Sequence, residues 1–394
     1  MIRKLSAHYI YPVNGKPLKY GTVTCNEDGE IIALIDNKGV FKEEANLEFY
    51  NGIITPGFVN AHCHLELSHL KGKIPMKSSL VEFVKNIRTL RSLDDPLKSI
   101  ILAEKEMVEA GIVVCGDISN STISFSVKKI SKIYFHSFIE IFGIQANISD
   151  LAWQNGLDIL RELQKKYGLV GNITPHAPYS LSEVLWKKIA HASHARPVTW
   201  SVHNQENADE DLLFAQKKGI IADFLKYIDS EFASMLPKGK SSIEALLPFY
   251  KQASKLLLVH NTFTRQEDIP FLRTLSENLF LVLCPNSNLY IEGTLPPISL
   301  LSEKGFNFAI GTDSLASNNK LSVLEELKTL QHNFPGIILE DLICWGTLNG
   351  ARALSCEQVY GSLEIGKRPG INLISGIDFT NMKLTADSQV QKLV

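Results

Sequence analysis

The middle of the chain alternates short apolar runs with longer amphipathic stretches. The apolar runs have the length and composition of buried strands, whereas the stretches between them carry apolar residues at three- and four-residue spacing and predict helices. Two examples of the helical pattern are residues 181–194 and 321–334. The predicted strands are, in chain order, IITPGFVN, IVVCGDI, IYFHSFIEI, LVGNITPH, VTWSVH, LLLVH, LFLVLCP and NFAIGTD. Strands that alternate with helices in this way predict a parallel α/β fold.

Polar residues at the ends of these strands distinguish between two parallel folds. A (β/α)8 barrel of the TIM type and a doubly wound open sheet both fit the alternation. In a closed barrel the carboxyl ends of all strands meet at one mouth, whereas in an open sheet they lie along an edge. The strand-end residues are His62, His64, His176, His203, His260 and Asp313. These side chains can act together in one site only if the strand ends meet at one mouth. We therefore expect a closed barrel over residues 56–360.

Both ends of the chain have a different pattern. Residues 1–55 and 361–394 contain short alternating runs separated by turn signals such as Asn-Gly and Asp-Gly near the N-terminus. Neither end segment can bury the face of a sheet alone. We therefore expect the two ends to pair into one small β-sandwich beside the barrel.

Composition and charge exclude several classes of protein. Of the 394 residues, 45% are hydrophobic and 21% are charged, which is typical of a globular protein with a substantial core. The 40 basic residues balance 42 acidic ones, so no overall field attracts nucleic acid or an anionic membrane. The N-terminus has no apolar signal segment, no stretch is long enough to span a bilayer, and the 6 cysteines form no C-x-x-C pair. We expect a cytoplasmic protein without nucleic-acid or membrane partners, whose cysteines are small buried residues.

His62 and His64 form the first candidate metal-binding pair. Residues two apart in a strand point to the same side, so both imidazoles face the barrel axis and can chelate a divalent ion. Two strand-end histidines bonded to loop carbonyls fit this pair equally well. His203 follows the apolar run VTWSV and adds a third nitrogen. Asp313 ends the last strand, where it either binds the ion and accepts a proton from water or caps the following helix.

Glu206 and His260 are candidates for proton transfer. Glu206 follows His203 by three residues, near enough to the ion to shuttle protons without binding it. The alternative is an acid that is favoured at the start of a helix. His260 ends the apolar strand LLLVH, where it fits either a role beside the attacking water or a hydrogen-bonded core position.

The fourth predicted strand bears on the number of metal ions. It contains no lysine that could be carboxylated to bridge two ions, which favours a single ion. His176, at the end of this strand, then fits a hydrogen bond to the substrate. Alternatively, it is a loop histidine held by Tyr179 or Ser180.

Together these motifs resemble the amidohydrolase superfamily. The matching segments are TPGFVNAHCHLELS, PHAPYS, HNQE, the strand-end His260, CPNSN and GTDS, in the same order along almost the whole chain. They are most similar to the branch of aromatic-ring deaminases and chlorohydrolases, which includes S-adenosylhomocysteine, methylthioadenosine and aminodeoxyfutalosine deaminases. GKRPGINLI departs from the more usual G-K-x-A-D run, in the predicted sandwich and away from the site.

The resemblance implies a role for each candidate residue. One zinc ion, or iron in its place, is expected to be held by His62, His64, His203 and Asp313. Glu206 matches the proton shuttle, and His260 matches the residue that holds the attacking water or the leaving group. His176 matches a substrate contact, and Glu82 lies near the position of a ribose-binding glutamate.

The resemblance also implies an activity. Because Glu206 provides the proton donor that ring deamination needs, we expect a hydrolytic deaminase that releases ammonia from an aromatic ring, with an adenosine-type nucleoside as its small-molecule substrate. Deamination of a free base such as guanine or cytosine, removal of chloride, and hydrolysis of a cyclic amide are the alternatives. A non-catalytic scaffold is disfavoured because every expected ligand is present. The resemblance is compatible with a homodimer, but the sequence defines no interface.

The substrate pocket is the least defined part of the sequence. Arg88 and Arg91 lie in the helix predicted after the first strand, and either meet a substrate carboxylate or are solvated surface charges. Residues 221–250 belong to a long connection between strands that we expect to overhang the mouth. Its aromatic residues either stack on a flat ring or pack a helical hairpin; they include Phe224, Tyr227 and Phe232.

Overall fold

A computed structural model describes residues 2–90, 95–194, 197–229, 236, 239–275 and 278–394. Within these residues, parallel strands alternate with helices, and the strands form two four-stranded sheets in the orders β6-β7-β8-β9 and β10-β11-β12-β13. The strands are β6 (Phe58–Cys63), β7 (Ile112–Ser119), β8 (Tyr134–Ile141), β9 (Val170–Pro175), β10 (Thr199–Asn204), β11 (Lys255–His260), β12 (Leu279–Leu283) and β13 (Asn307–Ile310). The predicted α/β fold is confirmed.

The two parallel sheets contact each other at both edges. At one edge, the Ser201 N–H donates to Thr174 Oγ1 at 2.8 Å, and the His203 N–H donates to the His176 carbonyl at 2.9 Å. At the other edge, the Thr312 N–H donates to the His62 carbonyl at 3.0 Å. Both sheets also contribute to one buried apolar cluster, whose members include Val59, Phe138, Leu257 and Val282.

The predicted first strand, residues 53–60, is in fact two strands. β5 (Leu47–Pro56) belongs to a different sheet, and β6 starts only after Gly57. A side chain at Gly57 would come within 2.5 Å of Val113, so the crossing from one sheet to the other requires glycine. The break is invisible in the apolar pattern because the chain is buried on both sides of it.

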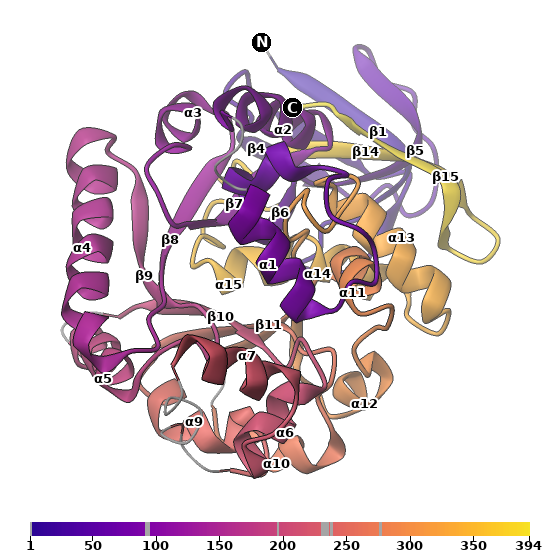
Figure 1. Ribbon diagram of the computed structural model, residues 1–394. Coiled ribbons are helices and arrows are strands. Elements are labelled where there is room, and N and C mark those ends of the chain that lie inside the picture. The colour runs from indigo at the N-terminus through magenta and orange to yellow at the C-terminus, as the bar shows by residue number, and fades with distance from the viewer. Residues whose placement is uncertain (1, 91–94, 195–196, 230–235, 237–238, 276–277) are drawn as a thin grey trace.

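Helices surround the parallel strands (Figure 1). The two helices predicted from their spacing are present as α5 (Glu183–Ser193) and α13 (Val323–Asn333). Each follows a serine, Ser182 or Ser322, whose hydroxyl oxygen accepts a backbone N–H of the first turn. The other helices in the described residues are α1 (Leu80–Leu90), α2 (Leu97–Glu109), α3 (Phe125–Ile130), α4 (Ser149–Lys166), α6 (Asp209–Gln216), α7 (Ile220–Ile228), α9 (Ser242–Tyr250), α10 (Ile269–Arg273), α11 (Pro285–Ile291), α12 (Ile298–Glu303), α14 (Leu339–Trp345) and α15 (Leu348–Ala353), with 3₁₀ helices η1 (Leu65–Leu70), η2 (Ala146–Ile148) and η3 (Gln266–Asp268).

Strands from both ends of the chain share a third sheet, which we call the terminal sheet. In the described residues its order is β15-β14-β5-β1-β3-β4, with β2 paired to β1. β14 pairs antiparallel with β5, Leu373 opposite Ile54, so strands from the two ends of the chain lie in one sheet. Figure 1 shows this sheet beside the parallel strands, with both termini on its side. Its further strands are β1 (Arg3–Ile10), β2 (Leu18–Lys19), β3 (Thr22–Cys25), β4 (Ile31–Ile35), β14 (Ile371–Asp378) and β15 (Lys383–Lys392).

The parallel strands are covered on both faces. Every residue of β6, β7, β10 and β12 is buried, as expected for strands that lie between other layers. Burial therefore extends to the polar side chains at the strand ends. None of the helices in the described part of the chain has the length and apolar character needed to cross a bilayer.

Candidate metal centre

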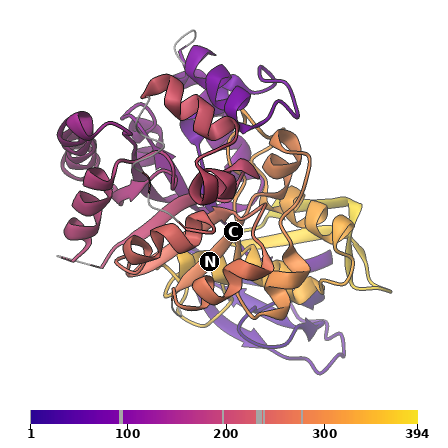
Figure 2. The same cartoon turned by 60° about the horizontal axis from the view of Figure 1, so that its bottom comes forward.

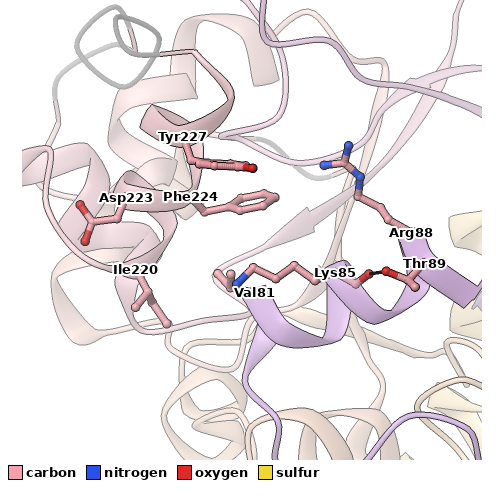
Figure 3. Close-up of a pocket in the computed structure, with 8 residues that line it drawn as sticks. All are labelled: Val81, Lys85, Arg88, Thr89, Ile220, Asp223, Phe224 and Tyr227. Carbon is pink, nitrogen blue, oxygen red and sulfur yellow. Dashed lines mark hydrogen bonds between the residues drawn. The ribbon is translucent and has the colours of Figure 1, made fainter.

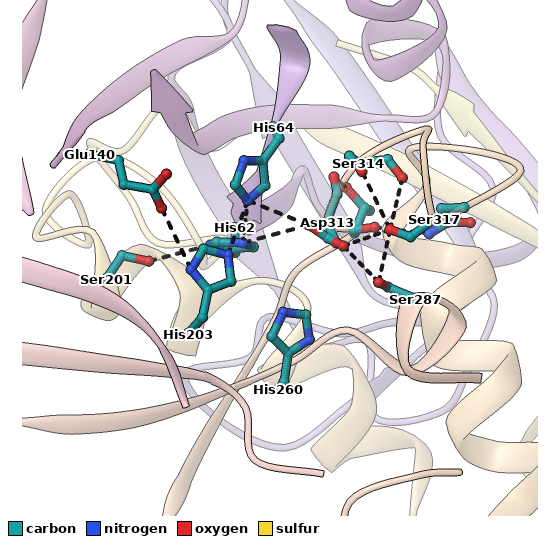
Figure 4. Close-up of polar contacts among 12 residues, drawn as sticks. His62, His64, Glu140, Ser201, His203, His260, Ser287, Asp313, Ser314 and Ser317 are labelled. Atoms are coloured by element: carbon teal, nitrogen blue, oxygen red, sulfur yellow. Dashed lines mark hydrogen bonds and ion pairs between the residues drawn. The ribbon is translucent and has the colours of Figure 1, made fainter. Parts of the chain in front are cut away.

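Four of the predicted site residues meet where the two parallel sheets join (Figure 4). His62 lies in β6, His64 directly follows that strand, and His203 lies in β10. Asp313 follows β13 and forms a parallel bridge with Cys63. Backbone pairing between the first and last parallel strands therefore brings this aspartate to the histidine pair.

The ring nitrogens of the three histidines are too close together for hydrogen bonds alone to explain. His64 Nε2 lies 3.1 Å from His62 Nε2 and 3.2 Å from His203 Nε2, yet it carries at most one proton to share. Asp313 Oδ1 lies 3.5 Å from His64 Nε2 and 3.8 Å from His62 Nε2. A tetrahedral zinc ion with Zn–N bonds of about 2.0–2.1 Å separates its ligand atoms by roughly 3.3–3.4 Å. The four side chains therefore fit one divalent ion of this size.

Burial keeps these imidazoles neutral. Burial is the main reason that the pKa of His62 lies well below its ordinary value and that the pKa of His64 is lowered to about 3. Burial also lowers the pKa of His203. His203 Nδ1 lies 3.0 Å from the His176 carbonyl, which can only accept, so Nδ1 carries the proton and the Nε2 lone pair faces the other rings. A neutral imidazole with its lone pair directed inward is the form that binds a metal ion.

Two serines hold the carboxylate of Asp313. The hydroxyls of Ser287 and Ser317 both donate to Asp313 Oδ2 at 2.6 Å. Burial raises the pKa of this carboxyl, but His64, His260 and the two hydrogen bonds together outweigh burial and hold the pKa below its ordinary value. The alternative role of Asp313 as a helix cap is wrong, because the next helix, α13, is capped by Ser322.

Glu206 and His260 face each other beside these residues. Glu206 Oε1 lies 3.6 Å from His260 Nε2, and both side chains are buried. Burial is the main cause that raises the pKa of Glu206 well above its ordinary value and that lowers the pKa of His260 to about 3. The alternative role of Glu206 as a helix-start acid is also wrong, because α6 begins only at Asp209. A buried carboxyl whose pKa is raised, beside an imidazole whose pKa is lowered, is suited to proton transfer.

His260 has its own orienting contact and a strained backbone. Asn288 Nδ2 lies 3.2 Å from His260 Nδ1, and because an amide nitrogen donates, Nδ1 accepts and Nε2 carries the proton toward Glu206. His260 and Asp313 have φ values of 74° and 55°, which residues other than glycine rarely adopt. Backbone conformations of this kind gather at functional sites.

His176 and Glu140 lie on the other side of His203. His176 Nδ1 is 2.9 Å from Ser180 Oγ, which fits the predicted alternative of a loop histidine held by Ser180. Glu140 Oε1 is 3.5 Å from His203 Nδ1, and Glu140 Oε2 accepts Asn120 Nδ2–H at 2.9 Å. Glu140 was missed in the sequence, although an acid next to the end of the strand IYFHSFIEI was a usable signal.

Glu82 and Arg88 lie on α1, and no contact joins them to the four candidate ligands within the described residues. Glu82 forms an exposed ion pair with Lys85 at 3.1 Å. Arg88 lines a separate cavity. Both substrate contacts remain predictions, and Arg91 and Phe232 lie outside the described residues.

A second group of potential ligands lies beside the histidine pair. Cys63, Cys115 and Asp117 place their ligand atoms within 4.8 Å of one another. Burial raises the pKa of both thiols, so they stay protonated. Asp117 Oδ2 pairs with Lys128 Nζ at 2.6 Å, with both side chains fully buried, and Asp117 Oδ1 accepts the Leu65 N–H at 2.8 Å. Because the lysine already neutralises the carboxylate, this group fastens the backbone rather than binding a cation.

Three histidines and an aspartate at the carboxyl ends of parallel strands are a ligand set that suits a metal-dependent hydrolase. The chain belongs to the amidohydrolase family, since the model described as "Amidohydrolase family" matches residues 53–393. The family resemblance of the sequence motifs is confirmed.

Individual proteins are similar over nearly the whole chain. An adenosine deaminase of Helicobacter pylori is 27% identical over 366 residues, which cover 90% of this chain and 86% of that protein. The crystal structure of H. pylori aminofutalosine deaminase in complex with methylthio-coformycin matches with a TM-score of 0.81 and 22% identity, over 95% of this chain and 92% of that one. An adenosine deaminase from Xanthomonas campestris with bound zinc matches with a TM-score of 0.70 and 21% identity, over 97% and 86%. The structural matches show a shared fold.

Proposed function

We propose that this protein is a metal-dependent hydrolytic deaminase that releases ammonia from the amino group of an adenosine-type nucleoside. The observation that carries the proposal is the buried Glu206 carboxyl, which lies 3.6 Å from His260 and is not one of the four candidate ligands. Ring deamination needs a proton donor beside the nucleophile, and a carboxyl whose pKa is raised by burial supplies one. The similar proteins named as adenosine and aminofutalosine deaminases favour the nucleoside class.

We assign the metal ion to His62, His64, His203 and Asp313. Zinc suits a set of neutral imidazoles and one carboxylate, and a similar adenosine deaminase structure contains zinc. A divalent ion in this position supplies the Lewis acidity by which water becomes a nucleophile near neutral pH. β9 offers no lysine to bridge a second ion, which supports a single ion.

The proposed roles of the other residues follow from their positions. Asp313, whose Oδ1 faces His62 and His64 while its Oδ2 is held by two serines, accepts a proton from the attacking water. Glu206 donates its proton to the ring nitrogen next to the amino-bearing carbon and so makes that carbon electrophilic. The His260 Nε2–H donates to the oxygen that adds to this carbon. The added hydroxyl then returns its remaining proton to Glu206 as the ring carbonyl forms. The proton held by Asp313 passes to the amino group, and the C–N bond breaks to release ammonia.

The fold proposal places this site at the mouth of a closed (β/α)8 barrel over residues 56–360. The contacts at both edges of the two parallel sheets, and the apolar cluster to which both contribute, support closure. For residues 1–55 and 361–394 we propose a small β-sandwich. Ile31 of β4 and Ile371 of β14 stand far apart in the strand order yet belong to one buried cluster, which supports a sheet folded onto itself.

Release of ammonia tests the proposed activity. Purified protein supplied with zinc is incubated with adenosine, methylthioadenosine, S-adenosylhomocysteine, guanine and cytosine. We expect ammonia, and a product with a ring carbonyl, from one or more of the adenosine-type nucleosides. Ammonia from guanine or cytosine alone would assign the protein to the free bases. Absence of ammonia from all five compounds, with metal bound, would contradict deamination of these rings.

A further inference from the structure

Glu206 and His260 come from two neighbouring strands. Glu206 follows the end of β10 by two residues, and His260 is the last residue of β11. The two strands pair in parallel with Asn204 opposite His260, which brings both side chains to the same end of the sheet. The strand pairing stops at this point. The 3.6 Å between Glu206 Oε1 and His260 Nε2 therefore depends on what holds the chain beyond the strand ends.

The residue between β10 and Glu206 is Gln205, whose backbone has an unusual conformation. Its φ is 46°, a left-handed value that residues other than glycine rarely adopt. The Gln205 N–H donates to Glu210 Oε1 and the Gln205 carbonyl accepts the Phe263 N–H, both at 3.0 Å. Because this turn comes directly before Glu206, it sets the direction in which the Glu206 side chain leaves the strand. Such a conformation persists only where the surrounding structure holds it.

The side chain of Gln205 is fully buried and uses every polar group of its amide. Gln205 Oε1 accepts the Thr264 hydroxyl at 2.6 Å. Gln205 Nε2 donates to Asp268 Oδ2 at 2.9 Å and to Asp211 Oδ1 at 3.2 Å. An amide turned over would place its oxygen against two carboxyl groups, so the contacts favour this orientation. The amide therefore fits its surroundings in one way.

These contacts connect the segment that carries Glu206 to the segment that leaves His260. Thr264 follows His260 by four residues, and Asp268 ends η3 directly before α10. The helices α6 and α10 lie at the bottom of Figure 1 and come forward in Figure 2. Within the residues that the structure describes, no hydrogen bond joins the Gln205 side chain to the four candidate ligands. Gln205 thus links the two segments without holding the metal site.

We propose that Gln205 is a positioning residue that sets the separation between Glu206 and His260. Its buried amide ties the segment after β10 to the segment after β11, so the two side chains meet at a fixed distance. A displacement of about 1 Å can lower the rate of a reaction about 10²-fold, because the reacting groups no longer meet in the productive geometry. The proposal rests on the proposed deaminase function, in which Glu206 and His260 act on neighbouring atoms of the same ring.

The test replaces Gln205 by methionine, which fills a similar volume without the amide. Ammonia release is measured with adenosine, methylthioadenosine and S-adenosylhomocysteine. In Gln205→Met, kcat should fall about 10²-fold while KM stays within about threefold, because Glu206 and His260 act in the chemical step and not in binding. The zinc content should stay at the wild-type level. Thr264→Val removes the hydroxyl bonded to the amide and should lower kcat less, and adding it to Gln205→Met should lower kcat no further.

A second buried glutamine separates positioning from stability. Gln331 of α13 is also buried, and its Oε1 accepts the Leu384 N–H at 2.6 Å. Gln331→Met should lower the resistance to urea, as Gln205→Met does, yet leave kcat unchanged. An unchanged kcat in Gln205→Met, or loss of zinc together with kcat, overturns the positioning role and leaves deamination intact.

Crystal structures cover the case in which the wild-type protein releases no ammonia, which would overturn the deaminase itself. A distance between Glu206 and His260 that is about 1 Å longer in Gln205→Met than in the wild type supports the positioning role. An equal distance in the two proteins overturns it. If Gln205→Met does not fold, Thr264→Val decides in its place, and an unchanged kcat and distance in that variant overturn the proposal.

Discussion

The candidate metal centre and a cavity of about 760 Å³ between helices α1 and α7, the α1–α7 cleft, are built in opposite ways (Figure 3). In the centre, every side chain sits at or just beyond a strand end and is held by a neighbour, as Ser201 holds His62 at 3.3 Å and Ser317 holds Asp313 at 2.6 Å. In the cleft, the side chains project from helix faces, and Tyr227 is 89% exposed. Buried strand ends therefore hold the candidate ligands in place, whereas the helix faces leave a large side chain exposed.

The largest effect is expected inside the buried site, at Glu206. Glu206→Gln keeps the shape of the side chain but removes the proton that the ring nitrogen receives, so kcat should fall about 10³-fold. Metal content should stay at the wild-type level, because Glu206 is not one of the four proposed ligands. The control Glu183→Gln, on α5 with the side chain 55% exposed, should keep full activity. A Glu206→Gln protein with kcat within tenfold of the wild type contradicts the proposed shuttle.

The next largest effect compares a buried ion pair beside the candidate metal centre with an exposed ion pair on α1. Lys128→Met leaves the fully buried Asp117 carboxyl without its partner, which should lower the free energy of unfolding by about 3–5 kcal/mol. Lys85→Met breaks the exposed pair with Glu82 and should cost less than about 1 kcal/mol. Urea unfolding measures both. Adding Asp117→Asn to Lys128→Met should restore part of the loss, and equal losses in the two single variants would contradict the contrast between the regions.

The smallest of the three effects concerns a contact behind a proposed ligand. Glu140 Oε1 lies 3.5 Å from His203 Nδ1 and favours the tautomer whose Nε2 is free to bind metal. Glu140→Gln should therefore lower zinc affinity about 10–100-fold, measured by competition with a chelator. Glu162→Gln, an acid of α4 whose side chain is 33% exposed, is the matched control. Unchanged zinc affinity in Glu140→Gln would show that the His176 carbonyl alone orients His203.

The same contrast explains what the sequence could predict. His62, His64, His203, His260 and Asp313 are predicted together because strand ends are visible in a local apolar pattern, and parallel strands bring their carboxyl ends together. The Gly57 break was hidden, because both strands around it are equally apolar.

The cleft could not be predicted from a local pattern. The sequence marks Arg88 and Phe224 separately as candidates for substrate contact, but their helices are far apart in the sequence, and only the folded chain brings them to one cavity. Glu140 was missed for a related reason, since its contact with His203 depends on the neighbouring strand order and not on spacing within one strand.

We propose that His62, His64, His203 and Asp313 hold one divalent ion. Anomalous diffraction from crystals of the zinc-loaded protein, collected on both sides of the zinc absorption edge, tests this assignment directly. We expect one zinc-specific peak, surrounded by the three Nε2 atoms and Asp313 Oδ1, and none at Cys63, Cys115 and Asp117. A peak at the cysteine group, a second peak beside the first, or no peak among the four side chains would contradict it.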